Sequence, residues 1–256
     1  MNPLHVSFSD DHSRAAFRLS HPKGNIVTAD MVAALTQALD GIADSPQLKL
    51  VTIEGSGPDF SFGASIPEHA PGEIDRVLPQ MHALIHALLE SPAVTAAIVR
   101  GRCLGGGFEL ALACDFVFAE RGAVFGLPEI ALGVFPPAAA ALLPARVGLA
   151  RATSAMLTGA SRSADDWFRF GLVEQLSDPG AIAVDVDRWF DAHLRPRSAA
   201  ALRHATAAAR LALRQHASAI LPELEQLYLG GLMSTADAAE GIAAFLAKRA
   251  PRWLDR

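Results

Sequence analysis

Two glutamates that stand among apolar residues are the groups in this sequence best suited to acid–base chemistry. Glu109 closely follows the glycines Gly105 to Gly107, and Glu129 comes later, within the segment Gly-Leu-Pro-Glu-Ile. Consecutive glycines leave a backbone amide open to close approach by a ligand oxygen. Two nearby carboxylates could hold and activate one water molecule. Together these features indicate chemistry on a carbonyl compound, in which backbone amides stabilise an oxyanion while the carboxylates move protons.

Each of these features also has a purely structural explanation. The glycines could form a tight turn between a strand and a helix, in which positive φ angles require glycine. Glu109 would then fall in the first turn of that helix, where the helix dipole favours a carboxylate. However, both glutamates have almost wholly apolar neighbours in the sequence. A buried carboxylate is costly unless it is paired or hydrogen-bonded, so the functional interpretation gains weight.

A second amide donor is available in the segment 60–65, which reads Phe-Ser-Phe-Gly-Ala-Ser. The segment follows a predicted strand and a glycine-rich turn, and Ala64 could supply its amide beside the one from the glycine triplet. Two converging amides make an oxyanion hole, whereas a single amide makes a poor one. Taken alone, this segment would be interpreted as an ordinary loop.

Other kinds of site have weaker support. His82 and His86 are spaced to share a helix face, but no third ligand is evident, so we predict a solvated face and no metal site. Ser61 and Ser65 have no histidine placed to activate them as nucleophiles. The sequence contains neither the Gly-x-x-x-x-Gly-Lys phosphate loop nor a Gly-x-Gly-x-x-Gly motif after a strand.

Composition excludes several classes of protein. The 256 residues suit one large domain, or a domain with an appendage, and a 51% apolar fraction supplies a sizeable core. A net charge of −5 without a basic block argues against a nucleic-acid partner. The longest apolar stretch, 130–145, is interrupted by glycine and prolines, and the N-terminus does not resemble a signal peptide. We therefore predict a cytoplasmic protein without a membrane span.

Helical and strand patterns alternate along most of the chain. Apolar residues recur at helical spacing over 32–42, 74–88 and 108–114, and buried strands are predicted at 48–54, 94–99 and 116–119. This alternation predicts an α/β fold with crossover connections. Strand signals stop near Arg195 and Ala-, Leu- and Arg-rich helices follow. We therefore predict a catalytic core over residues 1–195 and a helical C-terminal region over 196–256.

Several motifs occur in an order and at a spacing that point to a known family. They are Phe-Gly-Ala-Ser-Ile at 62–66, the segments 101–111, 114–115 and 125–133, and Glu-Gly-Ile-Ala-Ala-Phe-Leu-Ala-Lys-Arg at 240–249. From about Val6 to Arg249 the chain resembles the crotonase superfamily, also called the enoyl-CoA hydratase/isomerase family. The resemblance implies a spiral of strand–strand–helix units. It also implies that the C-terminal region makes trimer contacts, often within a hexamer.

The resemblance further implies an acyl-CoA thioester substrate and no cofactor, because coenzyme A belongs to the substrate. By position, the amides of Ala64 and Gly106 would form the oxyanion hole, and Glu109 and Glu129 match the two glutamates of the family's hydratases. Lys248 matches a C-terminal lysine that can reach a neighbouring subunit's nucleotide. The full set expected to contact the substrate or its CoA is Ala64, Ser65, Ile66, Pro67, Gly105, Gly106 and Lys248.

The sequence departs from the family pattern at two places. Ser65 stands where members usually have Asp, and the loop 134–140 reads Val-Phe-Pro-Pro-Ala-Ala-Ala where Pro-Gly-Ala-Gly-Gly is usual. Proline and alanine stiffen a loop and fill space, which predicts a reshaped acyl pocket. Both features resemble the cyclohexa-1,5-diene-1-carbonyl-CoA hydratase branch, which acts on an alicyclic dienoyl-CoA in aromatic-acid degradation.

We therefore predict an enoyl-CoA hydratase in which Glu129 is the main acid/base and Glu109 holds the water. A crotonase-fold isomerase, hydrolase or carbon–carbon lyase that uses the same oxyanion hole is the alternative. A non-catalytic binding protein, including an RNA-binding one, is disfavoured by the intact glutamates and by the acidic balance. The acyl group, and the choice between trimer and hexamer, are open at this point.

Overall fold

The larger sheet forms the centre of the fold. The computed structural model describes residues 2–70 and 72–256. The strand order is β1-β2-β3-β4-β6-β9. β1 and β2 are antiparallel, and the neighbours from β2 to β9 are parallel. The strands are β1 (Leu4–Phe8), β2 (Arg14–Leu19), β3 (Leu50–Gly55), β4 (Val94–Val99), β6 (Phe116–Glu120) and β9 (Gln175–Ser177).

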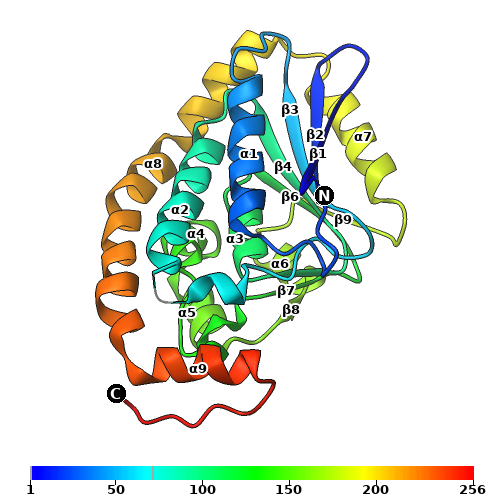
Figure 1. The fold of residues 1–256 in the computed structure, drawn as a ribbon. Coiled ribbons are helices and arrows are strands. Elements are labelled where there is room, and N and C mark those ends of the chain that lie inside the picture. Colours follow the sequence, from blue (N-terminus) through cyan, green and yellow to red (C-terminus); the bar gives the residue numbers. More distant parts are fainter. Residues whose placement is uncertain (1, 71) are drawn as a thin grey trace.

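Helices cover both faces of this sheet. Strand β4 is buried along its whole length, as expected for an apolar strand in a parallel sheet that is covered on both sides. One face packs against α7 (Ile182–His193), and the other packs against α1 (Ala29–Ile42) and α2 (Ile74–Glu90). Figure 1 shows α1 and α2 on one side of the strands and α7 on the other. The α/β prediction is confirmed.

A smaller sheet lies beside the first and carries one of the loops predicted to form the site. Its order is β5-β7-β8, formed by β5 (Arg102–Leu104), β7 (Val124–Gly126) and β8 (Arg162–Ser163). Two isolated bridges fasten the segment around Ala64 to its surroundings, one between Ser61 and Cys103 of β5 and one between Val27 and Ala64. The segment 61–64 is therefore held next to the strand that leads into the glycine triplet.

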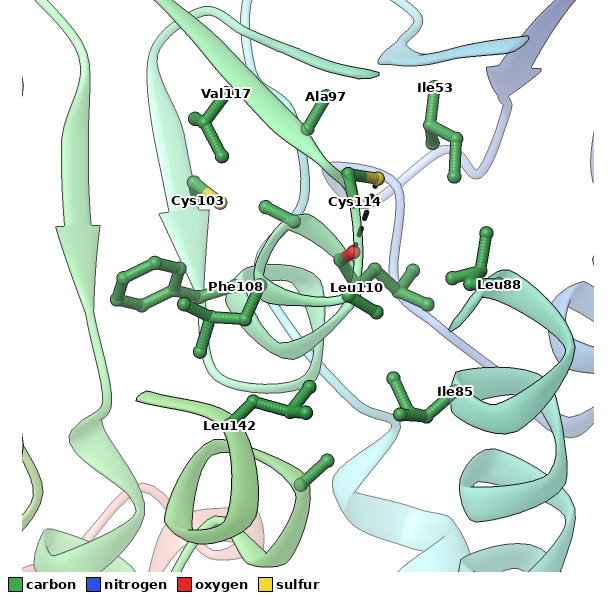
Figure 2. Packing of buried hydrophobic residues seen from close by; sticks show 14 of the residues in the cluster. Ile53, Ile85, Leu88, Ala97, Cys103, Phe108, Leu110, Cys114, Val117 and Leu142 are labelled. Atoms are coloured by element: carbon green, nitrogen blue, oxygen red, sulfur yellow. Dashed lines mark hydrogen bonds between the residues drawn. The ribbon is translucent and has the colours of Figure 1, made fainter. Parts of the chain in front are cut away.

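Helix α3 (Gly106–Leu112) begins at those glycines and is buried at every position. Figure 2 shows Phe108 and Leu110 in the same packed cluster as Ile85 and Leu88 of α2 and Leu142. Since neighbouring elements surround the helix, the core fixes the direction in which Glu109 projects.

The C-terminal part of the chain is helical. Helix α8 (Ala199–Gln226) packs against α2 and α4 (Pro137–Val147), and α9 (Ala236–Leu246) packs against the short turns η1 (Ile66–His69) and η2 (Pro128–Leu132). In Figure 1, α8 runs along the outer side of α2 and α9 lies beyond its end. The remaining elements are α5 (Leu149–Thr158), α6 (Ala164–Arg169), η3 (Leu227–Gly231) and η4 (Leu232–Ser234).

The division of the chain at residue 195 stays a prediction. Beyond that residue the described chain forms helices and turns and contributes to no strand, in keeping with the sequence pattern. Across residues 2–70 and 72–256, no helix combines the length and the apolar character needed to cross a membrane.

Candidate active site

The backbone amides of Ala64 and Gly106 lie side by side. A methyl group placed on Gly106 would lie 3.1 Å from the Ala64 nitrogen, so the two backbones are in close contact. Within the described ranges neither of these two amides donates a hydrogen bond to another part of the protein. Gly106 opens helix α3, so its N–H also carries the partial positive charge of a helix N-terminus. Both amides therefore retain the capacity to bind a ligand oxygen.

Glu129 extends from the turn η2 to the glycine that precedes Gly106. A methyl group on Gly105 would lie 2.5 Å from Oε1 of Glu129, and Gly105 has a φ of +47°. Glycine is required here for both reasons, because a side chain would collide with the carboxylate and this φ is costly for other residues. The glycine turn thus makes room for the Glu129 carboxylate directly beside Gly105.

Glu109 is held by the start of helix α4. Its Oε1 accepts a hydrogen bond of 2.9 Å from the backbone N–H of Ala139. Burial raises the pKa of Glu109 to about 7, although the amides of Ala138 and Ala139 act in the opposite direction. The segment 134–140, which the sequence marked as an unusual loop, is helical from Pro137 on, and the first turn of that helix anchors one of the two carboxylates.

The two carboxylates influence each other's protonation. Burial, and then the negative charge of Glu109, raise the pKa of Glu129 to about 8. Oε2 of Glu129 is buried and has no hydrogen-bond partner in the part of the chain that is described. Two interacting carboxylates of this kind titrate as a pair. Near neutral pH the pair can therefore hold a proton on one group while the other group accepts one.

The other residues predicted to contact the substrate lie away from the two glutamates, in the turn η1 and beyond helix α9. Ser65 and Ile66 are partly buried at the start of η1, and Pro67 is exposed. The amide of Ser65 donates to the carbonyl of Val27, which keeps η1 beside Ala64. Lys248 is exposed beyond the end of α9. The structure thus brings together the amides and the glutamates, with 65–67 adjoining them, and within the described residues no hydrogen bond or ion pair joins Lys248 to this group.

One prediction about histidine is wrong. His82 is not part of a solvated helix face: it is buried, and its Nδ1 lies 2.9 Å from Oε2 of Glu225 in α8. The packing of α8 over α2 covers this position. Within residues 2–70 and 72–256, no three histidine, cysteine, aspartate or glutamate side chains are grouped so as to hold a metal ion.

Tyr228 is a residue near the site that the sequence analysis did not single out. It is buried in η3, and the negative charges of Glu109 and Glu129 add to burial in raising its pKa well above the usual value. It is the chain's single tyrosine, but that fact alone does not connect it to glutamates more than 90 residues away.

Comparison with known proteins identifies the family of this chain. Residues 11–256 match the family described as enoyl-CoA hydratase/isomerase. The chain belongs to this family. The family predicted from the sequence motifs is therefore confirmed, over almost the full length of the chain.

Relatives of known sequence are similar over their whole length. The chain is 44% identical to "Cyclohexa-1,5-dienecarbonyl-CoA hydratase" of Thauera aromatica, over 100% of this chain and 98% of that protein. It is 28% identical to "Crotonyl-CoA hydratase" of Syntrophomonas wolfei, with 98% of each covered.

A solved structure extends the comparison to the fold. An enoyl-CoA hydratase from Mycobacterium avium subsp. paratuberculosis superimposes with a TM-score of 0.87 at 29% identity, over 99% of each chain. The predicted crotonase-type fold is confirmed.

Proposed function

We propose that this protein is a hydratase that adds water to an alicyclic dienoyl-CoA, with cyclohexa-1,5-diene-1-carbonyl-CoA as the candidate substrate. The observation that carries the proposal is the 44% identity, over the entire chain, to a hydratase named for that substrate. The loop 134–140 supports it as well, since this departure from the family pattern borders Glu109. The reaction consumes no oxidant or reductant, and coenzyme A enters only as part of the substrate.

In the proposed mechanism the thioester oxygen accepts hydrogen bonds from the amides of Ala64 and Gly106. Water adds its oxygen to the β carbon, and the electrons of the double bond move onto the thioester oxygen to form an enolate. The amides stabilise that negative charge as it develops. Loss of one such donor typically raises the barrier by about 2.7–4 kcal/mol.

The glutamates divide the proton transfers between them. Glu129 accepts the proton that the water loses, and Glu109, fixed by the amide of Ala139, holds the water in place. Glu129 then returns that proton to the α carbon of the enolate, which regenerates its carboxylate, so the product has gained one water and keeps its CoA. The raised pKa values of both carboxyl groups favour this role, because a general acid or base works best when its pKa lies near the working pH.

The decisive experiment is turnover of crotonyl-CoA beside cyclohexa-1,5-diene-1-carbonyl-CoA, followed by mass spectrometry of the products. We expect the ring substrate to gain one water and to react with a much higher kcat/KM than crotonyl-CoA. A preference for crotonyl-CoA would remove the alicyclic assignment. Release of CoA, or a moved double bond without water gain, would replace hydration with the hydrolase or isomerase alternative.

Glutamine variants test the roles of the two glutamates. We expect Glu109→Gln and Glu129→Gln each to lower kcat by about 10²-fold or more, in the range usual for loss of a general acid or base. Glu174→Gln is the matched control, because Glu174 is exposed. Circular dichroism should be unchanged in all three variants. Wild-type turnover in either active-site variant would refute the mechanism.

A homotrimer or homohexamer, built through residues 196–256, is part of the same proposal. Large apolar side chains that are exposed in this region support it, since such groups often mark an interface; they are Leu211, Leu227, Phe245, Leu246, Trp253 and Leu254. Sedimentation of the purified protein would give the number of copies. The reach of Lys248 to a neighbour's nucleotide and the cytoplasmic location stay predictions.

A further inference from the structure

The indole ring of Trp253 lies against two glycines near the end of the turn that carries Glu129. A methyl group on Gly133 would lie 3.2 Å from Cζ3 of this ring, and a methyl group on Gly241 would lie 3.1 Å from its Cη2. Gly133 ends η2, and Gly241 belongs to α9. The ring therefore touches both η2 and α9, while part of its surface stays exposed.

Glycine is needed at both positions because the two backbones meet there. A methyl group on Gly241 would collide with the backbone carbonyl of Leu132, the last residue of η2. Gly133 has a φ of +71°, which is costly for other residues, and a methyl group there would lie 2.9 Å from the carbonyl oxygen of Asp237. The backbones of η2 and α9 are thus in direct contact, and the indole covers the same two glycines.

The chain on both sides of Trp253 is tied to α9. The amide of Arg252 donates a hydrogen bond of 2.7 Å to Oε1 of Glu240, and the amide of Leu254 donates one of 2.6 Å to Oδ1 of Asp237. In Figure 1 the last segment of the chain runs back alongside α9. These bonds hold the backbone before and after the tryptophan, so its ring has a defined place on the two glycines.

The end of η2 is joined in turn to Glu129. The amide of Val134 donates to the carbonyl of Glu129 at 3.2 Å, and the amide of Gly133 donates to the carbonyl of Ile130 at 3.1 Å. The side chain of Glu129 reaches Gly105, where a methyl group would lie 2.5 Å from its Oε1. Its Oε2 is buried without a hydrogen-bond partner in the described chain. Since no partner holds Oε2, the place of the carboxylate depends on the turn.

We propose that Trp253 is a positioning residue: its ring holds η2 against α9 and so keeps the carboxylate of Glu129 beside Gly105, where it can take the proton from water. Trp253 acts through the turn and not on the substrate. The hold matters because a displacement of about 1 Å at a reacting group can lower a rate by about 10²-fold. This inference rests on the proposed function, which assigns the proton transfer to Glu129.

Trp253→Ala removes the ring from the two glycines. We expect kcat for the preferred thioester to fall by about 10–10²-fold, while KM stays within about twofold because the amides of Ala64 and Gly106 are untouched. Trp189→Ala is the matched control, since Trp189 packs on Phe116 in a separate cluster of the core. It should lower stability and leave kcat unchanged. A kcat for Trp253→Ala no lower than that of Trp189→Ala would overturn the proposal.

Gly241→Ala disturbs the same contact from the buried side. Gly241 is buried, so this variant leaves the exposed apolar surface, which includes Trp253, unchanged. Its methyl group would push the carbonyl of Leu132 away, and we expect the same fall in kcat with little change in KM. Gly41→Ala in helix α1 is the control, because its methyl group would meet no atom within 4 Å. A loss of kcat in Trp253→Ala without one in Gly241→Ala would assign the loss to subunit contacts and overturn the proposal.

The titration of Glu129 separates positioning from a general loss of stability. Burial, and then the charge of Glu109, raise the pKa of Glu129 to about 8 in the intact site. A loosened turn lets water reach the carboxylate, so its pKa should fall toward the ordinary 4.5 in both Trp253→Ala and Gly241→Ala. Carbon NMR of isotope-labelled glutamate would follow the carboxyl group, with Glu129→Gln to assign its resonance. A pKa equal to that of the wild type in either variant would overturn the proposal.

The NMR titration needs no turnover, so failure of this inference is distinct from failure of the proposed function. If the wild type hydrates neither thioester, the proposed function fails, and a lowered pKa in both variants would still support the hold of Trp253 on Glu129. Normal hydration with a wild-type kcat in Trp253→Ala would leave the function standing and remove the role of the tryptophan.

Discussion

At the scale of single residues, the site keeps two carboxylates where charge on both is costly. Glu109 is enclosed by apolar residues of the core and has one hydrogen bond from Ala139 to Oε1. Glu129 has one carboxylate oxygen buried without a partner in the described chain. Such an arrangement destabilises the folded protein once the groups ionise. It resembles the trade of stability for reactivity that is common at active sites.

This cost predicts how stability depends on pH. The folded pKa values, about 7 and about 8, lie above the ordinary 4.5. Between pH 4.5 and 8 the folded state therefore binds more protons than the unfolded state, and the free energy of unfolding falls as pH rises. Glu129→Gln is neutral at every pH and should remove much of this decline. We expect its melting temperature to exceed the wild type by on the order of 2–4 °C above pH 8.

Calorimetry from pH 4 to pH 9 would check this expectation. The difference between Glu129→Gln and the wild type should vanish below about pH 4.5, where both states hold their protons. The exposed control Glu174→Gln should follow the wild type throughout. A Glu129→Gln variant less stable than the wild type at high pH would contradict the burial cost.

At the scale of elements, the site depends on the close approach of two loops. The segment 61–64 is bridged to β5 and to the residues before α1, and the glycine turn that follows β5 lies against it. Glycine at 105 and 106 lets the backbones approach closely enough for the two amides to be neighbours. The proposed oxyanion hole thus depends on strand pairing as well as on the two glycines.

Gly106→Ala tests this approach. The added methyl would lie 3.1 Å from the Ala64 nitrogen, where the ligand oxygen is proposed to bind. We expect kcat/KM to fall by about 10²-fold, the usual effect of losing one oxyanion-hole donor. Gly122→Ala is the control, because its methyl would meet no atom within 4 Å and its backbone is unstrained. A Gly106→Ala enzyme with wild-type kcat/KM would argue against the hole.

At the scale of the whole molecule, helix α8 is joined to the central sheet by a buried ion pair. Arg210 of α8 is 4% exposed, and its Nε donates to Oδ1 of Asp115 at 2.7 Å. Its guanidinium also donates to the carbonyls of Ser91 and Ala93 before β4. Helix α8 is therefore anchored to the folded core.

Arg210→Met should destabilise the protein as a whole. Removal of one partner leaves the Asp115 carboxylate without its countercharge, which typically costs about 3–5 kcal/mol. Arg214→Met, one helical turn later, is the matched control: Arg214 pairs with Glu90 near the surface, where such a pair contributes about 1 kcal/mol or less. Urea denaturation would measure both. Equal losses in the two variants would disprove a central role for Arg210.

Local sequence patterns were sufficient for much of the fold. The buried strand 94–99, the helix capped by Thr28 and the helix 74–90 follow from side-chain periodicity and capping, which act within a few residues of the chain. Glu109 was identified as a candidate catalytic residue in the same way, because the glycines and apolar residues that single it out lie close to it in the sequence.

The partners of the functional side chains were decided by the tertiary structure. Ala139 binds Glu109 across 30 residues, and Glu225 binds His82 across 143, where the sequence analysis expected solvent. The influence of both glutamates on the pKa of Tyr228 has the same origin. Such contacts arise where distant elements cross, and no local spacing encodes which side chains meet there. The sequence by itself thus determined the helices, the strands and the reactive groups, whereas packing decided which atoms hold them and how their pKa values shift.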